Sequence, residues 1–358
     1  MSFDPSRPTD PDTAIAPRTA ADLVAAIPYL LGFHPADSLV LVSTHSAGQP
    51  GVEFTLRVDL PPPWAVSEMA AELARVVCAQ RCDELMLVVV GGAGGPPGRG
   101  GQPPRAEVVA EVAEACTVAG ASVWSEIWVA ELAAGAPWRC YGDCGCAGAL
   151  PDPASTPMAA AAVVAGQVTY ADRAELERVV APGEPSVLRR RAALLNRRID
   201  ELSREGADAL SSSREAVAAV EHWVDVAAVD RPQLTDEDVV RLCLALSDPL
   251  IRDAAFGYAF DGRAVAAERL WSTLVSEAPD PESAEAAVLL AHSALMRGDG
   301  ALAGMALARA QLAWPGHRLS GMVRSALDAG CGPDQLRDWF IQGSERAAEL
   351  LSRRGGRR

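Results

Sequence analysis

Three cysteines lie close together in the segment WRCYGDCGC: Cys140, Cys144 and Cys146. Thiolates this close can share a zinc ion, but a structural zinc site takes four ligands, usually as two paired knuckles. Asp143, Cys116 or a distant histidine would have to complete the site. We therefore prefer a tight turn with reduced cysteines, and zinc is the alternative cofactor. Redox chemistry at CGC, beside Arg139, is a further hypothesis.

A second group of polar residues surrounds the segment GFHPAD at 32–37. The group consists of His34, Asp37, Ser38, Arg57 and Asp59. His34, Asp37 and Ser38 lie on one turn, whereas a catalytic triad needs groups that converge from separate parts of a fold. The sequence has neither a GxSxG elbow to present a nucleophile nor an HExxH motif for a zincin. We therefore favour Asp37 or Ser38 as a residue that caps the turn.

The two charged residues of this group alternate along a predicted strand. Arg57 and Asp59 therefore lie on one face of that strand. We favour a solvated pair on the exposed face of a hairpin. In the alternative interpretation, the pair joins His34 and Arg139 in a ligand pocket at the carboxyl edge of a sheet, where open α/β folds bind ligands.

The glycine-rich stretch 91–101 follows a predicted strand, which is the position of a phosphate-binding loop. Gly92 and Gly94 begin a GxG pattern, but Pro97 replaces the third glycine and no GK[ST] follows. The prolines up to residue 104 also delay the helix whose N-terminus would hold the phosphate. We interpret the stretch as a flexible loop.

Strands and helices alternate in the first half of the chain. Periodicity predicts helices at 19–31, 61–81 and 106–120, and strands at 38–45, 52–60, 84–90 and 121–132. Thr19 followed by Asp22 resembles a capping box, and Pro28 is expected to kink or shorten the first helix. The order β-β-α-β-α-β predicts an α/β domain, a mixed sheet with packed helices.

From residue 155 onward every strong pattern is helical, and Thr235 with Asp238 marks the start of one helix. A constant shift aligns three pairs of residues: Ala255 with Ala291, Ala267 with Ala303, and Pro279 with Pro315. Small residues let two antiparallel helices approach closely, and the proline ends the second helix. The spacing predicts two tetratricopeptide-like hairpins, 248–279 and 284–315, although such arrays usually need about three repeats. The alternative is a generic alanine-rich bundle.

These patterns predict a two-domain protein. The expected parts are a flexible arm at 1–17, the α/β domain at 18–153, an all-α, tetratricopeptide-like helical domain at 154–350 and a basic disordered tail at 351–358. We place the boundary in ALPDPASTP at 149–157. Two domains also agree with a length of 358 residues, at about 150 residues per domain.

The charge of the chain limits its partners. The formal net charge is −15, which argues against nucleic acid or an anionic membrane as the main partner, because both prefer a basic surface. The polar, proline-rich N-terminus does not resemble a signal peptide, and no apolar run approaches the roughly 18 residues of a membrane span. We expect a cytosolic location, where the eight cysteines stay reduced.

A family resemblance extends over most of the chain. AAIPYLLGFHPADSLVLV at 25–42 is followed by RVDLP at 57–61, and Trp138-Arg139 leads into the cysteines and Gly148. With the segment 298–327, these motifs resemble the bacterial family called domain of unknown function 4192, found mainly in actinobacteria. The resemblance implies a fold and a bacterial, cytosolic origin, and it brings no catalytic residues to carry over. This chain departs from the family pattern at CGCAGAL, where a double cysteine and a proline are expected.

Two functions are compatible with these features. The preferred one is a non-catalytic cytosolic protein whose helical domain binds a protein partner, because the sequence shows a repeat, an acidic charge and no clear catalytic constellation. The alternative is an enzyme or small-ligand-binding protein with its site near the GFHPAD turn. A single pocket containing His34, Arg57, Asp59 and Arg139 would favour the alternative.

Overall fold

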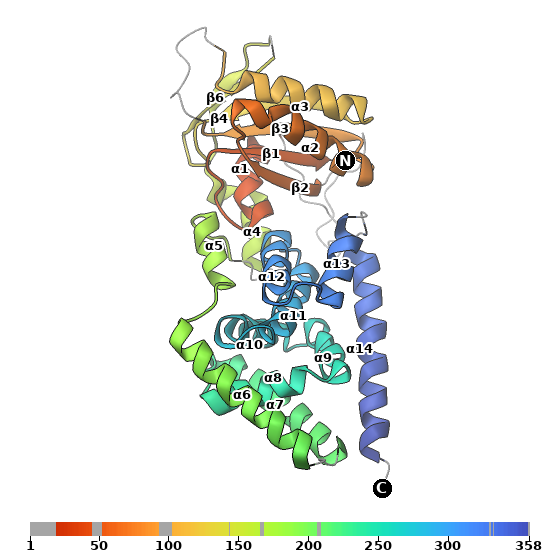
Figure 1. Cartoon of the computed structure of the whole chain (residues 1–358). Helices are drawn as coiled ribbons and strands as arrows, with labels where there is room; N and C mark the ends of the chain where they lie inside the picture. Colours follow the sequence, from red (N-terminus) through yellow and green to blue (C-terminus); the bar gives the residue numbers. More distant parts are fainter. Residues whose placement is uncertain are drawn as a thin grey trace, which may run out of the picture. The chain divides into compact units, whose positions relative to one another are not determined.

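The computed structural model describes residues 19–44, 52–92, 102–142, 144–164, 168–205, 209–328, 331 and 333–356. The chain forms two compact units, residues 1–172 and 173–358, and each is treated separately below (Figure 1). The predicted boundary at 149–157 lies within the first unit. The predicted arm at 1–17 lies outside the described residues, as does most of the glycine-rich stretch.

The first unit contains a six-stranded mixed sheet. The strands are β1 (Ser38–Thr44), β2 (Val52–Asp59), β3 (Glu84–Val90), β4 (Ser122–Val129), β5 (Pro137–Cys140) and β6 (Ala147–Ala149). Their order is β2-β1-β3-β4-β5-β6, and only β3 and β4 are parallel neighbours. The predicted mixed sheet with helices is confirmed. Strands β5 and β6 were not predicted, because runs of four and three residues are too short to show a period.

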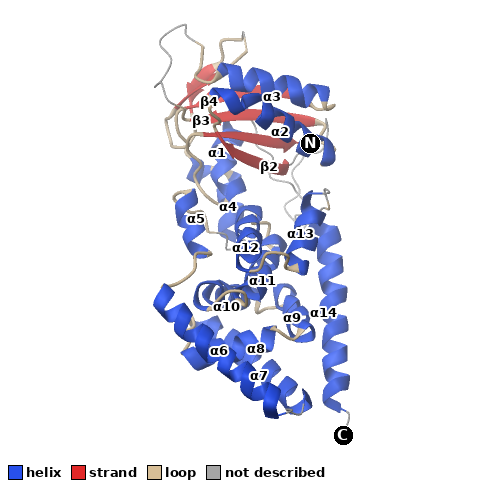
Figure 2. Ribbon diagram, in the orientation of Figure 1, coloured by secondary structure: helices blue, strands red, loops and turns tan. Residues whose placement is uncertain are grey.

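Helices cover both faces of this sheet (Figure 2). The helices of this unit are α1 (Ala20–Leu31), η1 (Pro63–Ala65), α2 (Val66–Ala79), α3 (Ala106–Val118), η2 (Pro153–Ser155) and α4 (Pro157–Val164), of which η2 and α4 pack against α1. Leu39 and Leu41 of β1 belong to the apolar core beneath α2 and α3. Val40 and Val42 are also buried and point to the other face, where α1 lies, because side chains alternate along a strand.

The first helix begins as the sequence predicts. The Thr19 hydroxyl accepts a hydrogen bond from the Asp22 N–H at 3.1 Å, and the Asp22 carboxylate accepts one from the Thr19 N–H at 3.0 Å. This reciprocal pair is a capping box. The expectation that Pro28 shortens the helix is wrong, because α1 continues through Pro28 and ends only at Gly32, whose φ is 73°. Proline costs the helix one hydrogen bond, and burial of the surrounding apolar residues outweighs that loss.

The second unit is helical, and its described residues contain no strand. Its helices are α5 (Arg173–Val179), α6 (Pro185–Glu205), α7 (Ala209–Val229), α8 (Asp236–Leu246), α9 (Pro249–Ala255), η3 (Phe256–Phe260), α10 (Ala264–Glu277), α11 (Ser283–Met296), α12 (Gly300–Ala313), α13 (Arg318–Asp328) and α14 (Pro333–Gly356). The helix α14 includes residues 351–356, which the sequence analysis placed in a disordered tail. An i,i+4 ion pair between Glu349 and Arg353 supports this last part. In the described part of the chain, no helix combines the length and the hydrophobicity needed to cross a bilayer.

The core of the second unit is built around α11. All residues from Ser283 to Ala294 are buried, and α10 and α12 pack against this helix. His292 of α11 contacts three aromatic rings, those of Phe256, Phe260 and Phe340. A helix that is buried all round has no face left for solvent, so α11 serves the core alone.

Candidate functional site

Three of the predicted residues of the first unit, Ser38, Arg57 and Asp59, meet where β2 ends and β1 begins. Arg57 donates from Nε to Ser38 Oγ at 2.8 Å, and its Nη2 lies 2.6 Å from Asp59 Oδ1. Its guanidinium carbon lies 6.0 Å from the centroid of the Phe33 ring. The strand register explains this contact: Ser38 is opposite Asp59 and Val40 is opposite Arg57, so the polar side chains share one face of the sheet.

The ion pair of Arg57 and Asp59 joins a buried guanidinium to an exposed carboxylate. The Arg57 side chain is 9% exposed and the Asp59 side chain 75%. The Arg57 Nη1 atom is buried and has no hydrogen-bond partner among the described residues. Leaving a buried donor unsatisfied costs roughly 1–3 kcal/mol. Arg57 can therefore donate one more hydrogen bond, and a carboxylate or phosphate oxygen is the acceptor that a guanidinium prefers.

Asp37 connects the GFHPAD turn to the end of β3. Its Oδ1 accepts a hydrogen bond from the Gly92 N–H at 2.8 Å, and its carbonyl oxygen accepts one from the Leu60 N–H at 3.0 Å. The neighbouring His34 is half-buried, and its main-chain N–H donates to the Tyr170 carbonyl oxygen at 3.1 Å. These contacts are those of residues that hold a turn in place.

Arg139 lies far from this cluster. It is on β5 opposite Trp128, and Trp128 belongs to the core beneath α2 and α3, whereas Arg57 is on the other face. The strand order puts β5 four strand spacings from β2, or roughly 19 Å. The structure therefore brings Ser38, Arg57 and Asp59 together and leaves Arg139 apart from them.

The three cysteines converge at the hairpin of β5 and β6. The Cys140 N–H donates to the Cys146 carbonyl oxygen at 2.9 Å, which continues the ladder beyond the Arg139–Ala147 pair. The Cys146 N–H lies 3.4 Å from Cys144 Sγ, so the sulfur accepts a main-chain hydrogen bond. Cys144 and Cys146 are exposed, and Cys140 is half-buried.

The thiols of this hairpin influence one another. Hydrogen bonds from the Cys146 thiol and N–H and from the Cys140 thiol lower the pKa of Cys144. Burial raises the pKa of Cys140, and the hydrogen bond with Cys144 raises that of Cys146. Among the described residues, no group of three or more His, Cys, Asp or Glu side chains is arranged to hold a metal ion. Asp143, one suggested fourth ligand, lies outside those residues, and the zinc site stays a prediction.

The second unit contains two concave surfaces of ligand size within its described residues. A groove of about 740 Å³ lies between α7, α9, η3 and α14. A second groove, of about 870 Å³, lies between α6, α7 and α8; we call it the α6–α8 groove. Its half-buried apolar residues are Leu194, Leu202, Trp223 and Leu244. Charged residues of both signs also line the groove, among them Arg197, Arg241 and Glu237.

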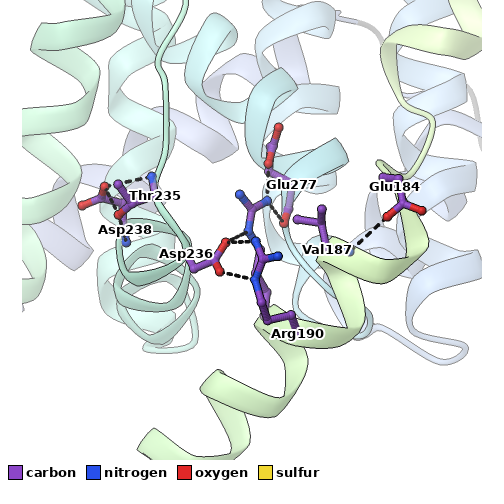
Figure 3. Close-up of polar contacts among 8 residues, drawn as sticks. Glu184, Val187, Arg190, Thr235, Asp236, Asp238 and Glu277 are labelled. Atoms are coloured by element: carbon purple, nitrogen blue, oxygen red, sulfur yellow. Dashed lines mark hydrogen bonds and ion pairs between the residues drawn. The ribbon is translucent and has the colours of Figure 1, made fainter.

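An ion-pair network holds α6 beside this groove (Figure 3). Arg191 donates from Nε to Asp236 Oδ1 at 2.9 Å and from Nη1 to both the carbonyl and the carboxylate of Glu277. Arg190 donates to the same Asp236 carboxylate, with Nη2 at 2.9 Å from Oδ1. Hydrogen bonds from Arg190 and Arg191 lower the pKa of Asp236 to about 2, against desolvation, which raises it. The network connects α6 to α8 and α10.

A comparison with protein families decides what this chain is related to. The model of the domain of unknown function DUF4192 matches residues 21–334. The chain belongs to the DUF4192 family. No curated protein and no solved structure shows significant similarity to it. The DUF4192 match includes the Arg57 cluster, the cysteine hairpin and the whole α6–α8 groove.

The Arg191 network of this DUF4192 member was not predicted from the sequence. A signal was present, because Arg191 lies one helical turn before the buried Leu195 and so falls on the apolar face of α6. A charge at a core position needs a buried partner. The identity of that partner, Asp236 on another helix, has no local signal in the sequence.

Proposed function

We propose that this protein is non-catalytic and that its helical unit binds a segment of a partner protein in the α6–α8 groove. The observation that carries the proposal is the groove itself, a concave space of about 870 Å³ lined by half-buried apolar residues and by exposed charged residues of both signs. Protein interfaces combine a buried apolar centre with a polar rim. Trp and Arg dominate interface energetics, and Trp223, Arg197 and Arg241 line this groove.

The groove is also held in shape before any partner binds. Arg191 is almost fully buried where it joins α6 to α8 and α10. A binding surface whose helices are already fixed loses less entropy on association. The Arg191 network therefore fixes the helices of the groove, and the half-buried apolar residues contact the partner.

The repeat supports an interaction module, and its tetratricopeptide-like character is part of the proposal. Ala284, Ala287 and Ala291 of α11 and Ala303 and Ala310 of α12 are buried, which suits close helix packing. The first hairpin is less regular, because the seven-residue α9 is followed by the 3₁₀ helix η3. Since α11 has no free face, the partner is expected on other helices, among which α6, α7 and α8 offer the groove. A cytosolic location in an actinobacterium belongs to the same proposal.

The test is site-specific photo-crosslinking in the cell. The full-length protein carries a photoreactive amino acid either at position 241, on the groove, or at position 346, an exposed arginine on α14. We expect a crosslinked protein from position 241 and none from position 346. The captured protein is then purified, and its affinity for wild-type protein is measured by calorimetry.

Charge reversal at the same two positions measures how much the groove contributes to the affinity for the captured protein. Arg241→Glu is expected to weaken binding at least tenfold, about 1.4 kcal/mol, and Arg346→Glu to leave it unchanged. Equal weakening by both variants, or equal crosslinking from both positions, would show that the groove is not the binding surface.

A second candidate function is the binding of a small anionic ligand by Arg57. It rests on one observation, the buried Nη1 atom that lacks an acceptor among the described residues. Calorimetric titration with phosphate and with acetate tests it. We expect binding to the wild type, and no binding to Arg57→Met, in which the donor is removed. Equal heats for the two proteins would rule this candidate out.

A further inference from the structure

The hairpin of β5 and β6 concentrates three thiols on an exposed turn. The register sets Arg139 opposite Ala147, so Cys140 and Cys146 are opposite each other at the next position, on either side of Cys144. Opposite residues in an antiparallel pair have Cα atoms about 4.5–5.5 Å apart, within the range that a disulfide can span. The backbone thus places Cys140 and Cys146 opposite each other, and Cys144 lies in the turn that joins them, with its Sγ 3.4 Å from the Cys146 main-chain nitrogen.

The sulfur of Cys144 interacts with both of the other cysteines. Its Sγ accepts from the Cys146 N–H at 3.4 Å, and interactions with the Cys146 and Cys140 side chains lower its pKa. It is exposed, so a small molecule can reach it. Hydrogen-bond donors around a sulfur favour the thiolate, which is the nucleophile in thiol chemistry.

The two neighbouring thiols are not equivalent. Cys140 is part of β5, which pairs with β4 at Ile127 and with β6 through the Cys146 carbonyl oxygen. The Cys146 thiol lies 4.0 Å from the main-chain oxygen of Cys144, so it also points to the backbone. Gly145 has a φ of 65° and gives the turn the conformation that brings the sulfurs together.

We propose that this hairpin is a thiol–disulfide exchange site for low-molecular-weight disulfides, with Cys144 as the attacking residue and Cys140 as the resolving residue. In the first step the Cys144 thiolate, its proton lost to solvent, attacks one sulfur of a disulfide RS–SR. A mixed disulfide Cys144–SR forms and RS⁻ leaves. In the second step the Cys140 thiolate attacks Cys144 Sγ, the Cys140–Cys144 bond forms, and the second RS⁻ leaves. Two cysteines are oxidised, one RS–SR is reduced, and the two cysteine protons end on two RSH.

The experiment uses reduced full-length protein and oxidised glutathione as the probe. Samples are alkylated at timed intervals and digested with trypsin and a protease that cleaves before aspartate. Cleavage after Arg139 and before Asp143 separates Cys140 from Cys144, so a bond between them joins two peptides. Cys78, an exposed cysteine on α2, is the internal control.

We expect Cys144 to react at least about tenfold faster than Cys78 and the wild type to end with a Cys140–Cys144 disulfide. Cys140→Ser is expected to accumulate the mixed disulfide of Cys144 with glutathione. Cys144→Ser is expected to reduce the reactivity of the hairpin to that of Cys78. Cys144 is exposed in the turn and Cys140 is the half-buried last residue of β5, so circular dichroism verifies that both variants fold.

Three outcomes would overturn the proposal. The first is reaction of Cys144 at the rate of Cys78. The second is a disulfide that joins Cys144 to Cys146 in the wild type, which would remove Cys140 from its assigned step. The third is that the hairpin thiols do not react with oxidised glutathione until a chelator is added, because that result would identify a metal site.

Discussion

At the residue scale, His292 is a histidine that burial keeps neutral. Desolvation lowers its pKa to about 3, and the rings of Phe256, Phe260 and Phe340 surround it. In the unfolded chain its pKa is about 6.5. Below that pH the unfolded state binds a proton that the folded state does not, so the protein loses stability as the pH falls.

We therefore predict a pH dependence that one substitution removes. Between pH 6.5 and pH 5, His292 is expected to cost the wild type about 2 kcal/mol of unfolding free energy, at 1.36 kcal/mol per pH unit. His292→Leu should lack that part of the dependence, and His222→Gln, at an exposed histidine, should keep it. Urea titrations at several pH values measure the difference. Parallel pH profiles for wild type and His292→Leu would contradict the prediction.

Two glycines with similar backbone angles provide a second residue-scale prediction. Gly91 and Gly135 have φ values of 73° and 78°. A Cβ atom at Gly91 would lie 2.8 Å from Asp37 Oδ1, and one at Gly135 would meet nothing within 4 Å. Alanine at either site is expected to cost roughly 1 kcal/mol for the left-handed backbone.

Gly91→Ala should cost more than Gly135→Ala, because the new methyl group also displaces the Asp37 carboxylate that accepts from Gly92. We expect an additional loss of about 1–2 kcal/mol in chemical unfolding. Equal losses for the two variants would show that the Asp37 contact contributes nothing to stability.

At the element scale, α6 is fixed by an arginine whose geometry lysine cannot reproduce. Arg191 is 6% exposed and binds both Asp236 and Glu277, whereas Arg190 is 59% exposed and binds Asp236 alone. A planar guanidinium satisfies several acceptors at once, and an ammonium group does not.

We predict that Arg191→Lys lowers the free energy of unfolding by about 2–3 kcal/mol and Arg190→Lys by less than about 1 kcal/mol. Both variants keep the charge and share the partner Asp236, so the comparison isolates burial and geometry. Chemical denaturation measures both values. A similar small loss for both would mean that the network does not hold α6.

At the scale of the whole molecule, the second unit has its own apolar core around α11. We therefore expect a fragment of residues 173–358 to show helical circular dichroism and a cooperative thermal transition by itself. A fragment that starts at residue 193 lacks Arg191 and should melt at a lower temperature or without cooperativity. A broad, non-cooperative transition for the longer fragment would show that the second unit depends on the first.

Local signals in the sequence determined the longer helices and strands of the first unit. The alternation in β2, the apolar runs of β1 and β3, and the helical period of α2 all depend on residues close in the chain. The capping boxes at Thr19 and Thr235 are equally local, and both are present. The short strands β5 and β6 have too few residues to show a period. They are defined only by pairing, of β5 with β4 and of β6 with β5.

Only the tertiary structure decided which candidate residues meet. Arg57 and Arg139 are both on strands beside family motifs, yet strand order and register put them on opposite faces and four strands apart. The same register sets Cys140 opposite Cys146 and makes one cluster of three thiols. Arg191 finds Asp236 and Glu277 on helices distant in the chain. Contacts of this kind depend on the packing of whole elements, and a period along the chain contains no information about them.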